Sequence, residues 1–349
     1  MAKWGWVWGG TLPSAGGWGH NWGMIRFLVS RLVQSIIVLW AVYTVTFFLL
    51  MLTPGDPFIS SEKKAPEAVR KALAEKYGLG YLVDSNKKSL PAREKAYYIG
   101  KAYVFYLGRA MTGDFGPSIE YENWTVADVI GASLPVSLTL GCFALLLALW
   151  GGVAAGTLGA IRKHRMSDVG LSVVTLLGVS LPSFVVGSLL IMGLEVAVPL
   201  MPVGGWGGGW AGLAKLVLPA VTLALFFLAY IARLTRSSTM DVLSADFVRT
   251  ARSKGLPAGR IVTRHVGSNA ILPVLSYLGP AAAYVLVGSF VVEKLFAIPG
   301  LGTHFVNGCL NKDIPLVLGA VLVYSVLVVV FNVLVDLAYA VVDPRITFH

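Results

Sequence analysis

The sequence predicts an all-α integral membrane protein with six membrane-spanning helices. Hydrophobic residues make up 56% of the 349-residue chain, charged residues only 13%, and the mean hydropathy is +0.73. In a soluble domain of ordinary composition, about a quarter of all residues are charged. The charges are absent from long apolar blocks and gather in the segments between them, which is typical of membrane spans and their loops.

Six blocks are long enough to cross a bilayer, which requires about 20 mostly apolar residues. They are residues 28–52, 135–161, 169–198, 216–231, 271–292 and 315–341. Pro182 and Pro280 lie inside the third and fifth blocks, where a proline removes a backbone hydrogen bond and kinks the helix. Each kink either shapes a path through the membrane or serves packing alone, and the sequence leaves both alternatives open.

The distribution of Lys and Arg predicts the orientation of these spans, because basic residues are retained in short cytoplasmic loops. If the N-terminus is cytoplasmic, the inner loops and ends contain Arg26, Arg31, Arg162, Lys163, Arg165, Arg233, Arg236, Arg249, Arg252, Lys254, Arg260, Arg264 and Arg345. The short outer loops then contain only Lys215, Lys294 and Lys312. Both termini are therefore predicted to be cytoplasmic. The net charge of +10 reflects this topology, and we expect no nucleic-acid partner.

The remaining organisation follows from the spans. Residues 1–23 form a Gly/Trp-rich extension without the pattern of a signal peptide, and they are either a flexible segment or an interfacial anchor. The first span occupies residues 24–52. A permease core with the other five spans occupies residues 132–342, and a tail follows at 343–349. Residues 53–131 are predicted to form a small extracytoplasmic helical subdomain, with helices at 66–77 and 92–111.

A short cytoplasmic helix is predicted between the fourth and fifth spans, at about residues 245–254. Ser244 is a suitable N-cap, Asp246 and Arg252 suit the first and last turns, and Gly255 suits a left-handed C-terminal residue. The alternative is a basic loop that only sets topology, which composition alone would favour.

One face of this predicted helix is apolar. Phe247, Val248 and Ala251 share it by their i, i+3, i+4 spacing. Because a helix this short is marginal by itself, we expect a partner to bury that face.

Ionisable residues give few signs of catalysis or metal binding. Asp336, near the inner end of the sixth span, is expected to form a structural hydrogen bond or ion pair. Glu195 and Glu293 are expected to be solvated at the outer ends. Cys142 and Cys309 suggest no disulfide framework, and the scattered histidines suggest no metal site. The sequence has no Gly-x-x-x-x-Gly-Lys-Ser/Thr phosphate-binding loop, so we expect no ATP site, no catalytic residue and no enzymatic activity in this chain.

Several motifs occur in an order that resembles a known family. They are Pro-Gly-Asp-Pro at 54–57, Gly-Asp-Phe-Gly-Pro-Ser at 113–118, the segment 246–257 with its continuation to residue 274, Pro-Gly-Leu-Gly at 299–302 and the end at 336–345. Together they resemble the permease subunits of binding-protein-dependent ABC importers, in the dipeptide and oligopeptide branch. Residues 204–209 and 275–280 look most like the B-type permease subunits of oligopeptide importers. The family's Glu-Ala-Ala triplet is replaced by Arg249-Thr250-Ala251, while Gly255 keeps the spacing.

The resemblance implies a type I ABC importer permease fold in a bacterial cytoplasmic (inner) membrane. It implies a coupling helix that docks on an ATPase and contains Ser244, Asp246, Phe247, Val248, Arg249, Ala251, Arg252 and Gly255. It also suggests a translocation path past Pro182, Ser183, Tyr277 and Pro280. The implied partners are a second homologous permease, two ATPase subunits that hold ATP and Mg, an extracytoplasmic peptide-binding protein, membrane lipid and the peptide.

The alternatives within this class are dipeptide, nickel-complex or glutathione substrates. A membrane-embedded protease would need paired catalytic side chains inside the spans, and the sequence shows none. A passive channel is the remaining alternative, and only co-purification with ATPases would separate it from an importer.

Overall fold

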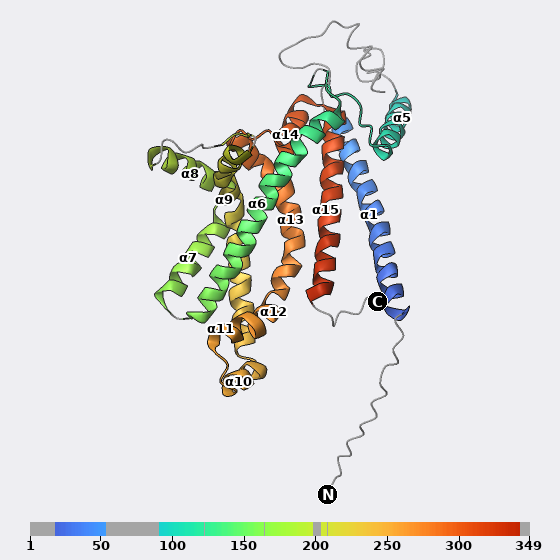
Figure 1. Ribbon diagram of the computed structural model, residues 1–349. Helices are drawn as coiled ribbons and strands as arrows, with labels where there is room; N and C mark the ends of the chain where they lie inside the picture. Colours follow the sequence, from blue (N-terminus) through green and yellow to red (C-terminus); the bar gives the residue numbers. More distant parts are fainter. Residues whose placement is uncertain are drawn as a thin grey trace.

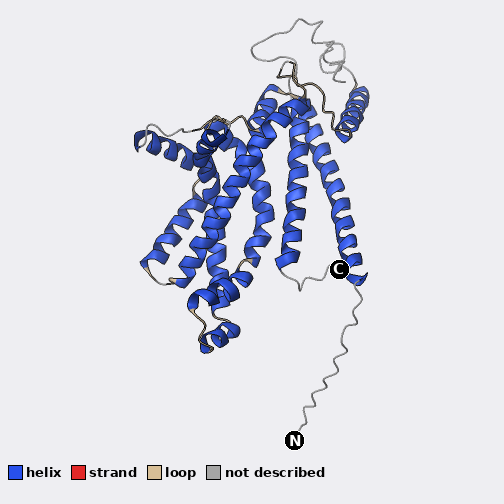
Figure 2. Ribbon diagram, in the orientation of Figure 1, coloured by secondary structure: helices blue, strands red, loops and turns tan. Residues whose placement is uncertain are grey.

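The structure is a computed structural model that describes residues 18–53, 91–121, 123–163, 165–197, 204–207 and 209–342. Over these ranges the chain is helical and contains no strand (Figure 2). The predicted helix at 66–77 and the predicted tail at 343–349 lie outside the described residues, as does most of the predicted extension at 1–23.

Six membrane spans can be assigned in the described part of the chain. Four are continuous helices: α1 (Trp18–Leu52), α6 (Val126–Ile161), α9 (Gly209–Leu243) and α15 (Ile314–Val342). The other two are bent: α7 (Met166–Ser180) followed by α8 (Ser183–Ala197), and α13 (Leu272–Leu295), which bends in its outer part. The predicted all-α fold with six spans is confirmed.

Shorter helices lie at the two ends of this bundle (Figure 1). One end carries α5 (Ala92–Met111), which matches the predicted helix at 92–111, and α14 (Leu301–Asn311). The opposite end carries α10 (Asp246–Ser253) and α11 (Ala258–Arg260). The first residues of α1 and the last residues of α15 lie toward this second end. The end with α5 and α14 is called the outer end and the end with α10 the inner end, after the orientation predicted from the sequence.

The centre of the bundle is the close pair α6 and α9. A Cβ atom added to Gly152 would lie 2.9 Å from the carbonyl oxygen of Leu228, and one added to Gly156 would lie 2.4 Å from that of Ala232. Small residues at these positions let the two backbones approach, as in other membrane helix pairs. The apolar core around Leu140 and other buried residues of α6, α9 and α13 extends from this contact.

The third predicted span, at 169–198, differs most from expectation. Its two halves, α7 and α8, meet at an angle of 113° instead of forming one kinked helix. Leu181 has an extended backbone, with φ −88° and ψ 131°, because the ring of Pro182 disfavours the helical conformation of the residue before it. The helix therefore restarts at Ser183 in a new direction.

The fourth predicted span, at 216–231, is too short. The helix continues to Leu243 past Arg236, a residue whose charge suggested the end of the span. Arg236 donates to both carboxylate oxygens of buried Asp168 on α7, at 2.7 and 2.8 Å. This bidentate ion pair joins α9 to α7.

Helix α1 lies at the edge of the bundle and packs on α15 and α5. Near the outer end Tyr43 and Phe47 are buried against Tyr106 of α5 and Ile314 of α15. Near the inner end Arg31 forms an ion pair with Asp336 at 2.7 Å. This pair agrees with the structural role expected for Asp336.

Candidate functional site

The candidate coupling helix α10 is held between the inner end of α9 and the chain that leads into α13. Its N-cap is Ala245, whose side chain makes no capping hydrogen bond. The predicted cap, Ser244, is wrong, because its hydroxyl donates to the carbonyl oxygen of Asp241 at 2.7 Å and completes the end of α9. Gly255 has φ +75°, so the predicted left-handed position is confirmed.

The chain itself buries the apolar face of α10. Val248 is 0% exposed and Ala251 is 6% exposed, and both pack with Ile261, Val266 and Ala270. Our expectation that a partner must bury these two residues is therefore wrong. Phe247, predicted to share their face, is 46% exposed and points away from this cluster.

The outward surface of α10 combines one large apolar side chain with charges. Asp246, Arg249 and Arg252 are exposed around Phe247. Arg249 lies 3.8 Å from Asp246, which in exposed positions is a weak interaction. An exposed aromatic side chain encircled by polar groups is typical of an anchor in a protein interface.

Motion of α10 can be passed to a membrane span through a nearly continuous helical chain. After Gly255 and Pro257 come α11, the π-helix η1 (Ile261–Val266), α12 (Gly267–Ala270) and then α13. The buried side chains of α10 pack on η1, while Val242 and Leu243 at the end of α9 pack on the same cluster. Helix α10 is therefore in contact both with the end of α9 and with the segment that leads into α13.

The predicted path residues fall into two separate places. Pro182 and Ser183 lie at the break between α7 and α8, toward the end of the bundle opposite α10 (Figure 1). Tyr277 and Pro280 lie on the half of α13 that is nearer to α10. The ring of Tyr277 stacks on that of Tyr230 with centroids 4.3 Å apart, and Pro280 lines a cavity of about 280 Å³.

Sequence reasoning missed a buried polar centre at the outer end of the bundle. Glu293 is 0% exposed, so our expectation that it is solvated is wrong. Its carboxylate accepts hydrogen bonds from the hydroxyls of Ser137 and Ser289, at 2.7 and 2.8 Å, and from the backbone N–H of Thr303 at 3.1 Å. The hydrogen bonds of a single side chain thus connect α6, α13 and α14.

The signal for this centre was present in the Pro-Gly-Leu-Gly motif. A Cβ atom on Gly300 would lie 2.4 Å from the Glu293 carboxyl carbon, and one on Gly302 would lie 2.8 Å from a carboxylate oxygen. The two glycines leave the space that the buried carboxyl group occupies.

A second missed carboxylate, Asp313, fastens the loop after α5. It is 0% exposed and accepts hydrogen bonds from the Ser118 hydroxyl and from the backbone N–H groups of Ile119, Glu120 and Leu316, the last three at 2.8 to 3.1 Å. Burial raises the pKa of this carboxyl group, and the hydrogen bonds partly oppose that shift. Ser118 ends the Gly-Asp-Phe-Gly-Pro-Ser element, so this motif has a structural role here.

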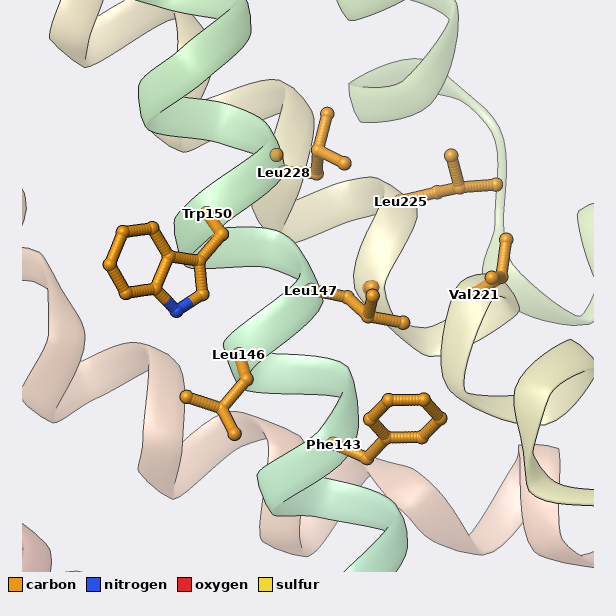
Figure 3. A pocket seen from close by; sticks show the side chains of 9 residues that line it. Phe143, Leu146, Leu147, Trp150, Val221, Leu225 and Leu228 are labelled. Carbon is orange, nitrogen blue, oxygen red and sulfur yellow. The ribbon is translucent and has the colours of Figure 1, made fainter. Parts of the chain in front are cut away.

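A shallow apolar groove of about 480 Å³ lies between α6 and α9 within the membrane-spanning region. Its lining side chains include Phe143, Leu146, Leu147 and Trp150 from α6 and Val221, Leu225 and Leu228 from α9 (Figure 3). The indole of Trp150 is 73% exposed. Such a surface suits contact with lipid or another apolar helix.

The fold and the site together define a polytopic helical membrane protein that presents a short aromatic-bearing helix at one end of its bundle. Residues 129–348 match the inner membrane component of binding-protein-dependent transport systems, and the chain belongs to this family. The resemblance inferred from the motifs is confirmed.

Individual relatives agree over almost the whole chain. The oligopeptide transport system permease protein OppB of Salmonella typhimurium is 40% identical over 93% of this chain and 100% of its own length. The dipeptide transport system permease protein DppB of Bacillus subtilis is 37% identical over 93% of this chain and 99% of its own length. The solved inward-facing MetNI methionine ABC transporter aligns with a TM-score of 0.48 and 15% identity over 62% of this chain and 96% of the other.

Proposed function

We propose that this chain is a permease subunit of an ATP-driven ABC importer of oligopeptides and forms half of the translocation path. Membership of the binding-protein-dependent transport family supports the class, and the likeness to OppB over its full length supports the substrate. The observation that carries the mechanism is α10, a helix fixed by its own chain through Val248 and Ala251 that leaves Phe247 exposed.

In this proposal α10 is the coupling helix. Phe247 enters a groove on a separate ATPase subunit, and Asp246, Arg249 and Arg252 surround it as a polar rim. ATP and Mg bind to the ATPase subunits, and closure of these subunits displaces α10. Because α10 packs on both the end of α9 and η1, the displacement turns the two spans as a unit.

The assembly follows from the same argument. One further homologous permease completes the path, two ATPases dock on the two coupling helices, and an extracytoplasmic binding protein delivers the peptide to the outer loops. The α10 end of the bundle is cytoplasmic, which puts the start of α1 and the end of α15 on the cytoplasmic side.

The second candidate is the same transporter class with a smaller substrate. The 37% identity with a dipeptide permease supports this alternative, and nickel complexes and glutathione also stay open. A series of peptides from two to about eight residues long separates the alternatives, because an oligopeptide importer responds to the longer members.

The test is peptide-stimulated ATP hydrolysis by the complete complex, purified with its partner subunits and reconstituted in lipid. We expect stimulation by oligopeptides in the presence of the binding protein, and co-purification of the ATPases with this chain. The proposal would be contradicted if no peptide in the series stimulated ATP hydrolysis, or if the ATPases failed to co-purify.

A further inference from the structure

One face of α13 is left uncovered by the residues that the structure describes. Ser276, Pro280 and Tyr284 recur every four residues along it and are all exposed, whereas Val274 and Val285 on the other side are buried. This α13 face runs through the half of the bundle nearer to α10 and reaches toward its middle.

The two borders of the α13 face differ in chemistry. On the α9 side lie aromatic pairs: Tyr277 stacks on Tyr230 with centroids 4.3 Å apart, and Tyr284 meets Phe227 edge to face at 5.8 Å. On the α15 side lies the cavity of about 280 Å³ that Ser276, Gly279, Pro280, Asn332, Val335 and Asp336 line. Groups able to form hydrogen bonds thus line one border within a membrane span.

Asn332 is the unusual member of this cavity. It lies within an otherwise apolar stretch of α15, and its amide forms no hydrogen bond with any residue that the structure describes. Gly279 makes room for it, since a Cβ atom there would lie 2.8 Å from the Asn332 Oδ1 atom. The Asn332 side chain is half-buried and lines the cavity.

Hydrocarbon is an unsuitable neighbour for this amide. An unpaired amide in an apolar medium costs several kcal/mol, so polar side chains in spans face water-filled cavities or other polar groups. The Arg31–Asp336 ion pair at the inner edge of the same cavity strengthens this argument, because both charges are partly exposed there. The cavity must therefore meet water, cargo or polar protein.

We propose that the cavity between α13 and α15 is a water-filled part of the translocation path, in which Asn332 binds main-chain amide groups of the peptide. The proposal rests on the proposed function and extends it to a substrate-contacting residue. A carboxamide both donates and accepts a hydrogen bond, as a peptide group does, so the two pair side by side. Such a contact does not depend on the side chains of the peptide, so it suits an importer of varied peptides.

Cysteine accessibility tests whether the cavity contains water. In a complex whose Cys142 and Cys309 are replaced by Ser, Ser276→Cys is compared with Leu334→Cys, using a positively charged methanethiosulfonate reagent. Leu334 is the matched control because it lies at the depth of Asn332 and is 53% exposed, on an apolar surface. A thiol ionises and reacts only in water, so we expect labelling at position 276 to be at least about tenfold faster and to be slowed by saturating peptide. Equal labelling of the two positions, or no effect of peptide, would overturn the proposal.

Transport kinetics test the amide contact. Asn332→Leu, which keeps the branched shape and the number of heavy atoms but removes the amide, is expected to raise the KM of peptide-stimulated ATP hydrolysis by roughly fivefold to tenfold, the value of one lost hydrogen bond. Asn332→Gln, which keeps the amide, should recover part of that loss. The increase should be similar for peptides with acidic, basic and apolar side chains, because the contact is with the backbone. An unchanged KM, or an increase confined to one class of peptide, would reject Asn332 as a main-chain ligand.

Measurements on the unsubstituted complex distinguish a failure of the proposed function from a failure of the inference about Asn332. If it shows no response to any peptide, the proposed function fails and this inference fails with it. If it responds normally while Asn332→Leu assembles and matches it in KM, only the inference fails. Assembly is checked by co-purification of the ATPases with the variant.

Discussion

The two ends of the bundle are stabilised by different means. At the outer end two buried carboxylates, Glu293 and Asp313, gather hydrogen bonds from segments far apart in the sequence. At the inner end α10 is held by a small apolar cluster around Val248 and Ala251. Hydrogen bonds require fixed geometry, whereas apolar contacts tolerate sliding. The outer end is thus fixed in one arrangement, while the contacts at the inner end are of the kind that would permit the movement proposed for α10.

The largest effect should come from removing the outer centre. Glu293→Ala leaves the hydroxyls of Ser137 and Ser289 and the N–H of Thr303 without their acceptor, and it leaves a cavity. We expect a loss of roughly 4 kcal/mol of stability, since each buried unpaired group costs about 1–3 kcal/mol. Thermal unfolding of the complex in detergent measures it. Glu293→Gln keeps the shape and one acceptor and should lose clearly less. Equal losses for the two variants would contradict this account, because they would show that the retained volume and acceptor contribute nothing to stability.

Substitutions at two adjacent residues of α10 test the contrast between its buried and its exposed face. Val248→Asp buries a carboxylate in the apolar cluster and should cost roughly 3 kcal/mol and prevent assembly. Phe247→Asp changes an exposed side chain and should leave the unfolding temperature nearly unchanged, yet separate ATP hydrolysis from uptake. Unfolding and peptide uptake are measured on both variants. Normal uptake by Phe247→Asp would contradict docking through this residue.

The smallest effect concerns pH at the outer end. Burial raises the pKa of Asp313 in the folded protein above its value in the unfolded chain. The folded state therefore holds this proton more tightly, so the contribution of Asp313 to stability is greatest at acidic pH and falls as pH rises through the folded pKa. Unfolding temperatures recorded between pH 5 and 8 on the unsubstituted protein and on Asp313→Asn check this. The variant should show a flatter profile, and identical slopes would mean that Asp313 does not titrate in this window.

The sequence predicted the apolar spans well because each needs only length and composition. The same holds for α5 and for the left-handed Gly255, since Pro and Gly act locally. The break at Leu181–Pro182 was underestimated, because a proline shows that a helix is disturbed but not by what angle. The pairing of Arg236 with Asp168 joins α9 to another helix, and no local pattern reveals such a partner.

The candidate site was predicted in position but not in orientation. Helical spacing put Phe247 beside Val248 and Ala251, yet the direction of the buried face depends on η1, which packs against α10 from later in the chain. Glu293 was misread for a related reason. A lone acid near the end of a span looks solvated until the donors from Ser137, Ser289 and Thr303 are brought to it by folding.

The π-helical turn η1 has a consequence for how the chain tolerates changes in length. A π turn contains one residue more than the α turn that would replace it. Removing one residue from 261–266 can therefore restore an ordinary α turn and leave the register of α13 intact. The same deletion inside α13 would rotate every later side chain by about 100°. The turn η1, between α10 and α13, is thus the place where the chain can lose one residue without a change in the register of α13.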